Sequence, residues 1–336
     1  MKKSFDYYIA RWKDFRKAQK GVSDFSSYLS NGEFLFNWDF SSAEIVHFDK
    51  TIHVSAKEYA KDNKKISRLK QTILEILKQK NTDNDGVYHC EKVMITSSNT
   101  IKGFDYYKDL VITKFLSCQE MEQYLQQKDN AAIYFHCCNT VDILKKDNVI
   151  IEQRLIDKSN SAVEKFEKLL DYYIANQAIK TSETIDIPVY SAEKECHDVF
   201  QKWYDDFNIH PMRFPKNMQH GDLWDGNVFI DKNDVTLIDF DKIDYHSCFY
   251  DLLLFIFSEA FTNDDLTLFK LFFDGKYDSY FKQLLHIDQN ENIQKQVLYI
   301  CFLNEMFTSR FQNTDIDFLH SLLNTINKWN RTLGIL

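Results

Sequence analysis

The chain has 336 residues, of which 44% are hydrophobic and 15% aromatic, so it can bury a large core and is not a disordered protein. Its 50 acidic residues outnumber its 41 lysines and arginines, and the net charge of −9 argues against a general nucleic-acid-binding protein. With 8 glycines and 3 prolines, collagen-like and low-complexity chains are excluded. At roughly 100–200 residues per domain, the length predicts two domains.

Cysteine usage and hydropathy indicate a reducing compartment. The seven cysteines form no CxxC pair, which favours buried thiols over a structural zinc site. The N-terminus lacks the apolar segment of a signal peptide. The longest strongly apolar run, Leu252–Phe257, is far shorter than the ~20 residues of a membrane-spanning helix. We therefore expect a cytoplasmic protein without an integral membrane segment.

The first part of the chain is predicted to be rich in strands. Residues 4–20 have apolar residues at helical spacing and a basic opposite face, which predicts a helix that packs on its own domain or binds an anionic surface. Residues 34–57 are rich in β-formers and predict strands. A helical period follows at 64–80, and further strands are predicted at 92–96 and 110–116.

The pattern changes near residue 117, after which most segments have helical periodicity. The predicted helices cover residues 119–128, 161–177, 191–207, 246–261, 264–274, 291–310 and 315–332. A loop with short strands at 218–241 interrupts them. We therefore predict an α+β chain with two lobes: a small β-rich N-terminal lobe, residues 1–117, and a larger, mainly helical C-terminal lobe, residues 118–336.

The interruption at 218–241 contains the chemistry-bearing residues. A glycine precedes each of Asp222 and Asn227, so both polar residues are expected on tight turns. Two apolar, β-forming segments flank Asp231–Asp234 and predict a hairpin, which would bring Asn227 close to Asp239. Carboxylate and amide oxygens suit Mg²⁺ better than a transition metal. The sequence thus predicts an oxygen-rich site at one end of a hairpin.

The motif resembles a known family of enzymes. His220-Gly221-Asp222 is followed by Asn227, and Asp239-Phe240-Asp241 ends an apolar strand. The order and spacing of these residues resemble those of the catalytic loop and the later metal-binding aspartate in protein kinases. With HGD in place of HRD, it resembles the aminoglycoside phosphotransferase and choline kinase-like family of small-molecule kinases, and the string HGDLWxGN is also similar to that of fructosamine kinases. The resemblance implies a two-lobed, protein-kinase-like fold.

The resemblance also implies roles for individual residues, with ATP and Mg²⁺ as cofactors. Asp222 would be the catalytic base that orients the acceptor hydroxyl, and His220 would brace the loop by hydrogen bonds. Asn227 and Asp239 would bind Mg²⁺. Asp251, in the Asp-Leu pair that opens a later helix, would cap that helix and support the loop.

In the N-terminal half, the resemblance implies a nucleotide site. Ser41 and Ser42 occupy the place of the phosphate-binding loop, although an ordinary hairpin turn would have the same composition. Lys57 is the candidate for the lysine on the α- and β-phosphates, with Lys50 as the alternative, and a solvated lysine is equally consistent with the pattern. The backbone near Leu116 would meet the adenine edge.

Two functions from different classes follow. The first is an ATP- and Mg²⁺-dependent phosphotransferase whose partners are a nucleoside triphosphate and a small-molecule hydroxyl acceptor: a sugar, an aminoglycoside or an amino alcohol. The second is a kinase-fold binding protein with little or no transfer activity, because the phosphate loop lacks glycine and Leu69 occupies the position of the lysine's usual Glu partner.

Residues 259–305 contain eight acidic residues and four lysines. This acidic excess would suit a cationic acceptor or form a solvated face. A third hypothesis is an adaptor protein that binds a membrane surface through residues 1–20.

Overall fold

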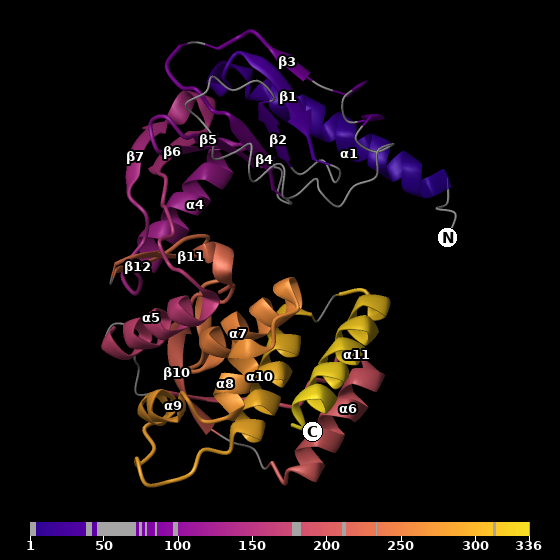
Figure 1. The fold of residues 1–336 in the computed structure, drawn as a ribbon, viewed down its shortest axis with the longest axis vertical. Helices are drawn as coiled ribbons and strands as arrows, with labels where there is room; N and C mark the ends of the chain where they lie inside the picture. The colour runs from indigo at the N-terminus through magenta and orange to yellow at the C-terminus, as the bar shows by residue number, and fades with distance from the viewer. Residues whose placement is uncertain are drawn as a thin grey trace. The chain divides into compact units, whose positions relative to one another are not determined.

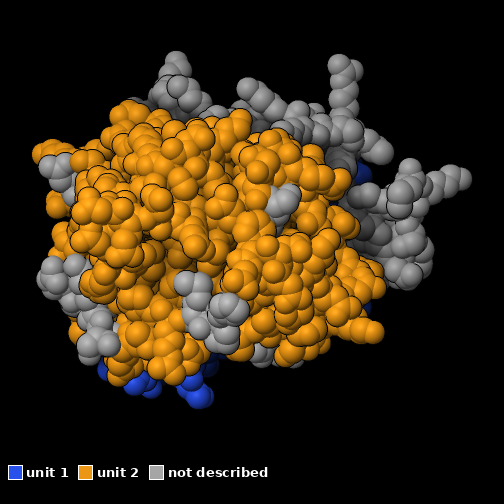
Figure 2. All heavy atoms as spheres, turned by 90° about the horizontal axis from the view of Figure 1, so that it is seen from below, with its two compact units in different colours: residues 1–126, 138–155 blue, residues 127–137, 156–336 orange. Residues whose placement is uncertain are grey.

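The computed structural model describes most of the chain as two compact units. The described residues are 5–37, 42–45, 72–73, 76–77, 79–84, 86–96, 100–176, 183–209, 213–232, 234–311 and 314–335. Unit 1 contains residues 1–126 and 138–155, and unit 2 contains residues 127–137 and 156–336 (Figure 2). Each unit is described by itself.

Unit 1 is built on an eight-stranded sheet whose described pairs are antiparallel (Figure 1). Its strand order is β3-β1-β2-β4-β5-β6-β8-β7. The strands are β1 (Gly32–Phe36), β2 (Ser42–Ile45), β3 (Gln79–Asn81), β4 (Lys92–Ile95), β5 (Ile101–Asp105), β6 (Leu110–Lys114), β7 (Thr140–Leu144) and β8 (Val149–Gln153). Burial alternates along β5, so one face of that strand is directed into the core.

Helix α1 (Phe5–Asp24) packs against this sheet, and α4 (Cys118–Ala131) follows β6 (Figure 1). Phe15 of α1 is buried and contacts Phe36 of β1 edge to face, with ring centroids 5.5 Å apart. Trp12, one turn earlier on the expected apolar stripe, is instead exposed. The predicted helix is thus confirmed and runs from Phe5 to Asp24, with Phe15 on its buried face.

Two predictions for unit 1 need correction. The predicted helix 64–80 lies mostly outside the described residues, and its last two residues belong to β3. The strands β7 and β8 fall in a region where mainly helices were predicted. Asn148, between them, adopts the left-handed conformation with φ 55°, which permits the tight connection that turns the chain back. Pairing of β8 with β6 completes the sheet, a long-range contact that local periodicity does not reveal.

Unit 2 is mainly helical, so the predicted α+β class with a sheet-rich N-terminal part and a helical C-terminal part is confirmed. Its helices are α5 (Ala162–Ala175), α6 (Lys194–Asp206), α7 (Tyr250–Asn263), α8 (Thr267–Phe273), α9 (Asp278–Leu285), α10 (Lys295–Arg310) and α11 (Ile316–Leu333). Helices α7 and α10 contact each other in the centre of the unit (Figure 1), and most of their residues are buried. Among the described residues, no helix is long and apolar enough to cross a bilayer.

Short strands interrupt the helices of unit 2 where the sequence predicted a break. β10 (Arg213–Gln219) pairs with β9 (Thr184–Asp186) and β13 (Asp244–Ser247). β11 (Val228–Asp231) and β12 (Asp234–Leu237) form the predicted hairpin, with Val228 opposite Leu237. The candidate site lies where β10 and this hairpin meet.

Candidate active site

The candidate catalytic loop begins directly after β10. Gly221 has φ 76°, a conformation that L-amino acids with a side chain rarely adopt. A Cβ atom at this position would also overlap the carbonyl oxygen of Lys242. Only glycine satisfies both constraints, so the turn that presents Asp222 depends on this residue.

A buried carboxylate holds the loop in place. Asp251 is fully buried near the start of α7. Its Oδ1 accepts the backbone N–H of Gly221 at 2.9 Å, and its Oδ2 accepts the N–H of His220 at 2.5 Å and the hydroxyl of Tyr173. The predicted loop support is present, but the predicted capping is wrong: the N-cap residue of α7 is Phe249, whose side chain forms no cap hydrogen bond.

His220 links the loop to the far end of the hairpin. Its Nε2 lies 2.7 Å from the carbonyl oxygen of Ile238, and its Nδ1 accepts the N–H of Asp222 at 3.3 Å. This pattern assigns the proton to Nε2 in a neutral ring. Burial among Phe135 and Phe240 lowers the pKa of His220, which favours the neutral form.

The hairpin brings Asn227 and Asp239 to the end of the strands that adjoins Asp222. Asn227 is buried, and its side-chain Nδ2 donates to the backbone carbonyl of Asp222 at 2.9 Å. The backbone carbonyl of Asn227 accepts the N–H of Ile238 at 3.1 Å. Asp239 follows with φ 70°. Within the described residues its carboxylate has no hydrogen-bond or ion-pair partner, and Oδ1 of Asn227 is likewise unused.

The donor set at this end of the hairpin fits a hard divalent cation. The amide of Asn227 presents its oxygen because its nitrogen is already occupied. Partial desolvation and the neighbouring charge of Asp239 raise the pKa of Asp241. In the described part of the chain, no group of three or more His, Cys, Asp or Glu side chains is placed to hold a metal ion by itself. Two protein oxygens suit Mg²⁺ that receives its remaining ligands from water and substrate phosphates.

Sequence reasoning missed Lys165, which anchors the middle of the loop. This lysine of α5 is buried, and its Nζ lies 2.6 Å from carboxylate oxygens of both Asp157 and Asp225 and 3.0 Å from the carbonyl oxygen of Asp225. A signal was present: Lys165 lies one helical turn before Leu169, on the buried face of the helix. A charged residue on that face needs a partner, which here is the loop.

Sequence reasoning also missed Arg310, the last residue of α10. Its Nη2 forms an ion pair with Oδ1 of Asp222. Arg310 lines a cavity of about 690 Å³ in unit 2. The other lining residues are Gly221, Asp241, Lys242, Ile243, Asp244, His246, Tyr250, Thr308, Ser309 and Phe311. A long-range contact of this kind leaves no local pattern in the sequence.

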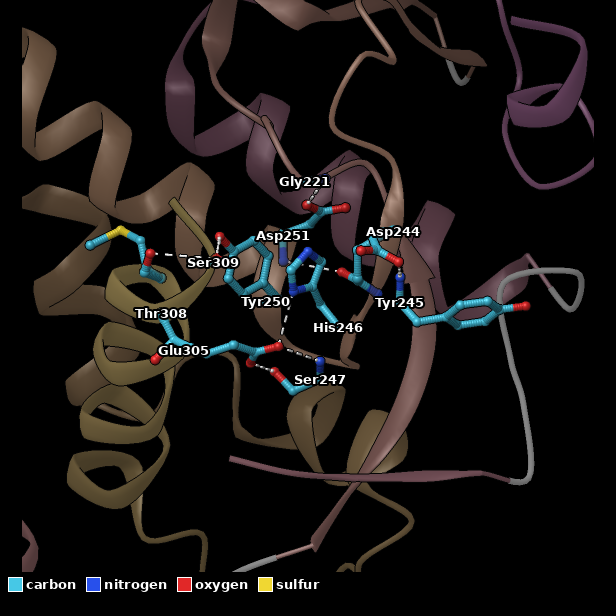
Figure 3. Close-up of polar contacts among 12 residues, drawn as sticks. Gly221, Asp244, Tyr245, His246, Ser247, Tyr250, Asp251, Glu305, Thr308 and Ser309 are labelled. Carbon is cyan, nitrogen blue, oxygen red and sulfur yellow. Dashed lines mark hydrogen bonds and ion pairs between the residues drawn. The ribbon is translucent and has the colours of Figure 1, made fainter. Parts of the chain in front are cut away.

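One wall of this cavity is held by a buried polar cluster (Figure 3). Glu305 accepts the N–H and the hydroxyl of Ser247 at 3.0 and 2.6 Å and contacts Nδ1 of His246 at 3.1 Å. The His246 ring stacks on Tyr250, with centroids 4.1 Å apart. The hydroxyl of Tyr250 lies 3.1 Å from that of Ser309. The cluster therefore fixes β13 against the C-terminal half of α10.

The structure places only some of the predicted nucleotide residues. Ser41 and Lys57 lie outside the described residues. Ser42 is the first residue of β2 and pairs with Met94, and its side chain is not among those described. Leu116 is exposed just after β6, and its N–H donates to a carboxylate oxygen of Glu120 at 3.1 Å. The backbone carbonyl of Leu116 is therefore the better group for an external donor.

Asp251→Asn is expected to destabilise the protein. The amide nitrogen would face buried donors that the carboxylate now accepts, and each unsatisfied donor costs about 1–3 kcal/mol. The free energy of unfolding, measured by urea denaturation, should fall by at least that amount. Tyr173→Phe, which removes only one of the donors, should cost less. Equal stability of wild type and Asp251→Asn would contradict the anchoring role.

The His246–Glu305 pair is expected to make stability depend on pH. Burial alone would lower the pKa of His246, but the hydrogen bond to Glu305 and its charge outweigh burial and raise it. The stabilisation is thus fully present below the unfolded pKa of roughly 6.5 and is lost as pH rises through the folded value. In urea denaturation, the stability difference between wild type and His246→Gln should shrink from pH ~6 to ~8. A difference that stays constant or grows would contradict this assignment.

The segment that holds the site is similar to a known family. The model described as "Phosphotransferase enzyme family" (APH) matches residues 164–280, which include the loop, the hairpin and Asp251. No curated protein matches the chain.

Several solved structures are similar to the chain at low identity. Amicoumacin kinase hAmiN, in complex with AMP-PNP, Ca²⁺ and Ami, is 12% identical with a TM-score of 0.38 over 69% of this chain and 86% of its own. Aminoglycoside phosphotransferase APH(3'')-Id from Streptomyces rimosus ATCC10970 is 10% identical, with a TM-score of 0.38 over 63% and 91%. Choline kinase LicA from Streptococcus pneumoniae is 12% identical, with a TM-score of 0.34 over 71% and 90%. The family model covers the segment that holds the motif, so residues 164–280 are similar to the phosphotransferase enzyme family.

Proposed function

We propose that this protein is an ATP- and Mg²⁺-dependent phosphotransferase that moves the γ-phosphoryl group to a hydroxyl of a small molecule. The observation that carries the proposal is the convergence of Asp222, Asn227 and Asp239 at one end of the β11–β12 hairpin. Bonds from Asp251 and His220 hold this arrangement. Phosphoryl transfer depends on positioning and charge stabilisation, and a rigid loop of this kind supplies both.

Asp222 is proposed to act as the base. Its Oδ1 is engaged by Arg310, while its Oδ2 has no partner among the described residues and is open to an acceptor hydroxyl. The carboxylate would orient that hydroxyl and take its proton as the oxygen attacks the γ-phosphorus. The main chain of Asp222 is fixed on both sides, since its N–H bonds to His220 and its carbonyl to Asn227.

Asn227 and Asp239 are proposed to hold the metal through Oδ1 and the carboxylate, the two acceptors that have no partner within the described residues. When bound, Mg²⁺ neutralises charge on the phosphate oxygens. His220 keeps Asp239 in place indirectly, because it binds the carbonyl of the preceding Ile238. Its neutral state avoids a positive charge that would compete with the metal.

The nucleotide is proposed to bind through the N-terminal lobe, residues 1–117, and the acceptor through the C-terminal lobe, residues 118–336. Ser41 and Ser42 would contact the phosphates, Lys57 would pair with the α- and β-phosphates, and the backbone at Leu116 would meet the adenine. A cytoplasmic location, where ATP and Mg²⁺ are present, agrees with this activity. The competing function is a kinase-fold binding protein that holds nucleotide without transferring phosphate.

The metal site predicts a metal-dependent effect of nucleotide on stability. ATP should raise the melting temperature of the wild type only when Mg²⁺ is present, and a hundredfold excess over Kd stabilises by ~2.7 kcal/mol. Asp239→Ala should abolish the metal-dependent part of the shift, measured by thermal denaturation. Asp231→Ala, which changes an exposed carboxylate at the other end of the hairpin, is the matched control and should behave as wild type. An equal shift in the wild type and Asp239→Ala would remove Asp239 from this role.

The proposed base predicts a selective loss of turnover. Asp222→Asn keeps the size of the side chain but removes the charge, so kcat on an acceptor found by screening for ATP consumption should fall about 10²–10⁴-fold. Affinity for ATP should stay near normal, because other residues hold the nucleotide. Wild-type kcat in this variant would refute the assignment. A wild-type protein that binds Mg²⁺·ATP but consumes none with any acceptor would instead support the binding-protein alternative.

A further inference from the structure

The contact between Arg310 and Asp222 lies at the edge of the 690 Å³ cavity in unit 2. Arg310 and Gly221, the residue before Asp222, line the cavity, and the side chains of Arg310 and Asp222 are 25% and 33% exposed. Because Asp222 is proposed to face the acceptor hydroxyl, the remainder of the acceptor must occupy the space beside it. Arg310 is therefore a candidate for contact with the acceptor as well as with the base.

The guanidinium of Arg310 has unused donors. Of its five N–H groups, only one at Nη2 has a partner among the described residues. Partial burial removes water from this cation and lowers its pKa, yet an arginine keeps its charge in a protein. A planar cation with free N–H groups binds carboxylate or phosphate in a two-point geometry that neutral and cationic groups cannot match.

The other charges around the cavity do not reverse this preference. Lys242 adds a second cation, whose charge acts on the carboxylate of Asp241. Asp244 uses one carboxylate oxygen to accept the N–H of Tyr245 at 2.7 Å. Asp241 lies beside the proposed metal site, next to Asp239. None of the eight acidic residues in 259–305 lines the cavity, so the acidic excess expected to favour a cationic acceptor lies elsewhere.

We propose that Arg310 determines acceptor specificity and recognises a carboxylate or phosphate substituent of the acceptor. The inference rests on the proposed phosphotransferase function and narrows its acceptor class. The same guanidinium contacts Asp222, so the anionic group and the reacting hydroxyl must lie within a few bonds of each other. Hydroxy acids, sugar acids and sugar phosphates satisfy this requirement, whereas unmodified aminoglycosides and amino alcohols do not.

A purely structural role for the ion pair has a different signature. A partly exposed pair contributes little to folding, and a cation in the last turn of a helix also interacts favourably with its dipole. In that case, replacing Arg310 would change stability slightly and would affect all acceptors alike. A specificity role predicts a change that depends on the charge of the acceptor.

The test compares neutral, cationic and anionic acceptors within two series of small molecules. ADP formation from Mg²⁺·ATP is measured with glucose, glucosamine, glucuronate and glucose 1-phosphate, and with glycerol, ethanolamine and glycerate. The anionic members should be the preferred acceptors of the wild type. Arg310→Gln should raise their KM about 10- to 100-fold, the range expected for loss of a charge-assisted hydrogen bond, and should leave KM for ATP unchanged. Arg310→Lys should recover part of the loss, because it keeps the charge without the planar geometry.

Arg213→Gln is the matched control, because this exposed arginine pairs with Asp186 and lies outside the cavity. It should behave as wild type. A preference for neutral or cationic acceptors, no use of any anionic member, or an equal effect of Arg310→Gln on all acceptors would each overturn the inference. The Mg²⁺-dependent melting shift with ATP separates the two proposals: its absence in the wild type defeats the phosphotransferase, whereas its presence without an anion preference defeats only the role of Arg310.

Discussion

The buried carboxylate of Asp251 is the constraint on which the candidate site depends. Removing a charge from water is costly unless hydrogen bonds replace the lost hydration. Here two successive backbone N–H groups and a tyrosine hydroxyl replace it, and they come from β10's C-terminal extension and from α5. The backbone N–H of Asp251 in turn donates to Gln219, the last residue of β10. A strand, a loop and two helices are thus tied at one point, and the loop has a single conformation because any other would leave this charge unsatisfied.

From Asp251, the rest of the site is held by hydrogen bonds that involve the backbone rather than by long side chains. His220 bonds to the carbonyl of Ile238 at the end of β12, and Asn227 bonds to the carbonyl of Asp222. Lys165 fixes the turn between Asp222 and Asn227 through its contacts with Asp157 and Asp225. Asp222 and Asn227 carry short side chains on a backbone that is hydrogen-bonded on both sides, so little entropy remains to be lost there when a substrate binds. This arrangement agrees with a reaction whose rate depends on alignment.

The parts of the molecule that the sequence predicted well are those that local patterns determine. The hairpin and its turn at Asp231–Asp234 follow from alternating β-formers. The helices α5, α6, α7, α8, α10 and α11 follow from their periodicity, whereas α9 was not predicted. Contacts between distant segments were not predictable. Strand β8 is a short apolar run that becomes a strand only because β6 offers an edge. Arg310 reaches Asp222 across 88 positions, and the capping role expected for Asp251 was wrong because the loop, not its helix, supplies its donors.

The division of the chain between its units has a consequence for the order of synthesis. Residues 127–137 belong to unit 2 but precede β7 and β8, which complete the sheet of unit 1. Phe135 in this segment stacks on Phe240 and contacts the ring of His220, and the carbonyl of His136 accepts the N–H of Leu237. During translation, this segment leaves the ribosome long before the loop it supports. A fragment beginning at residue 156 would contain the proposed base and metal ligands, Asp222, Asn227 and Asp239, and still lack part of the aromatic wall around His220.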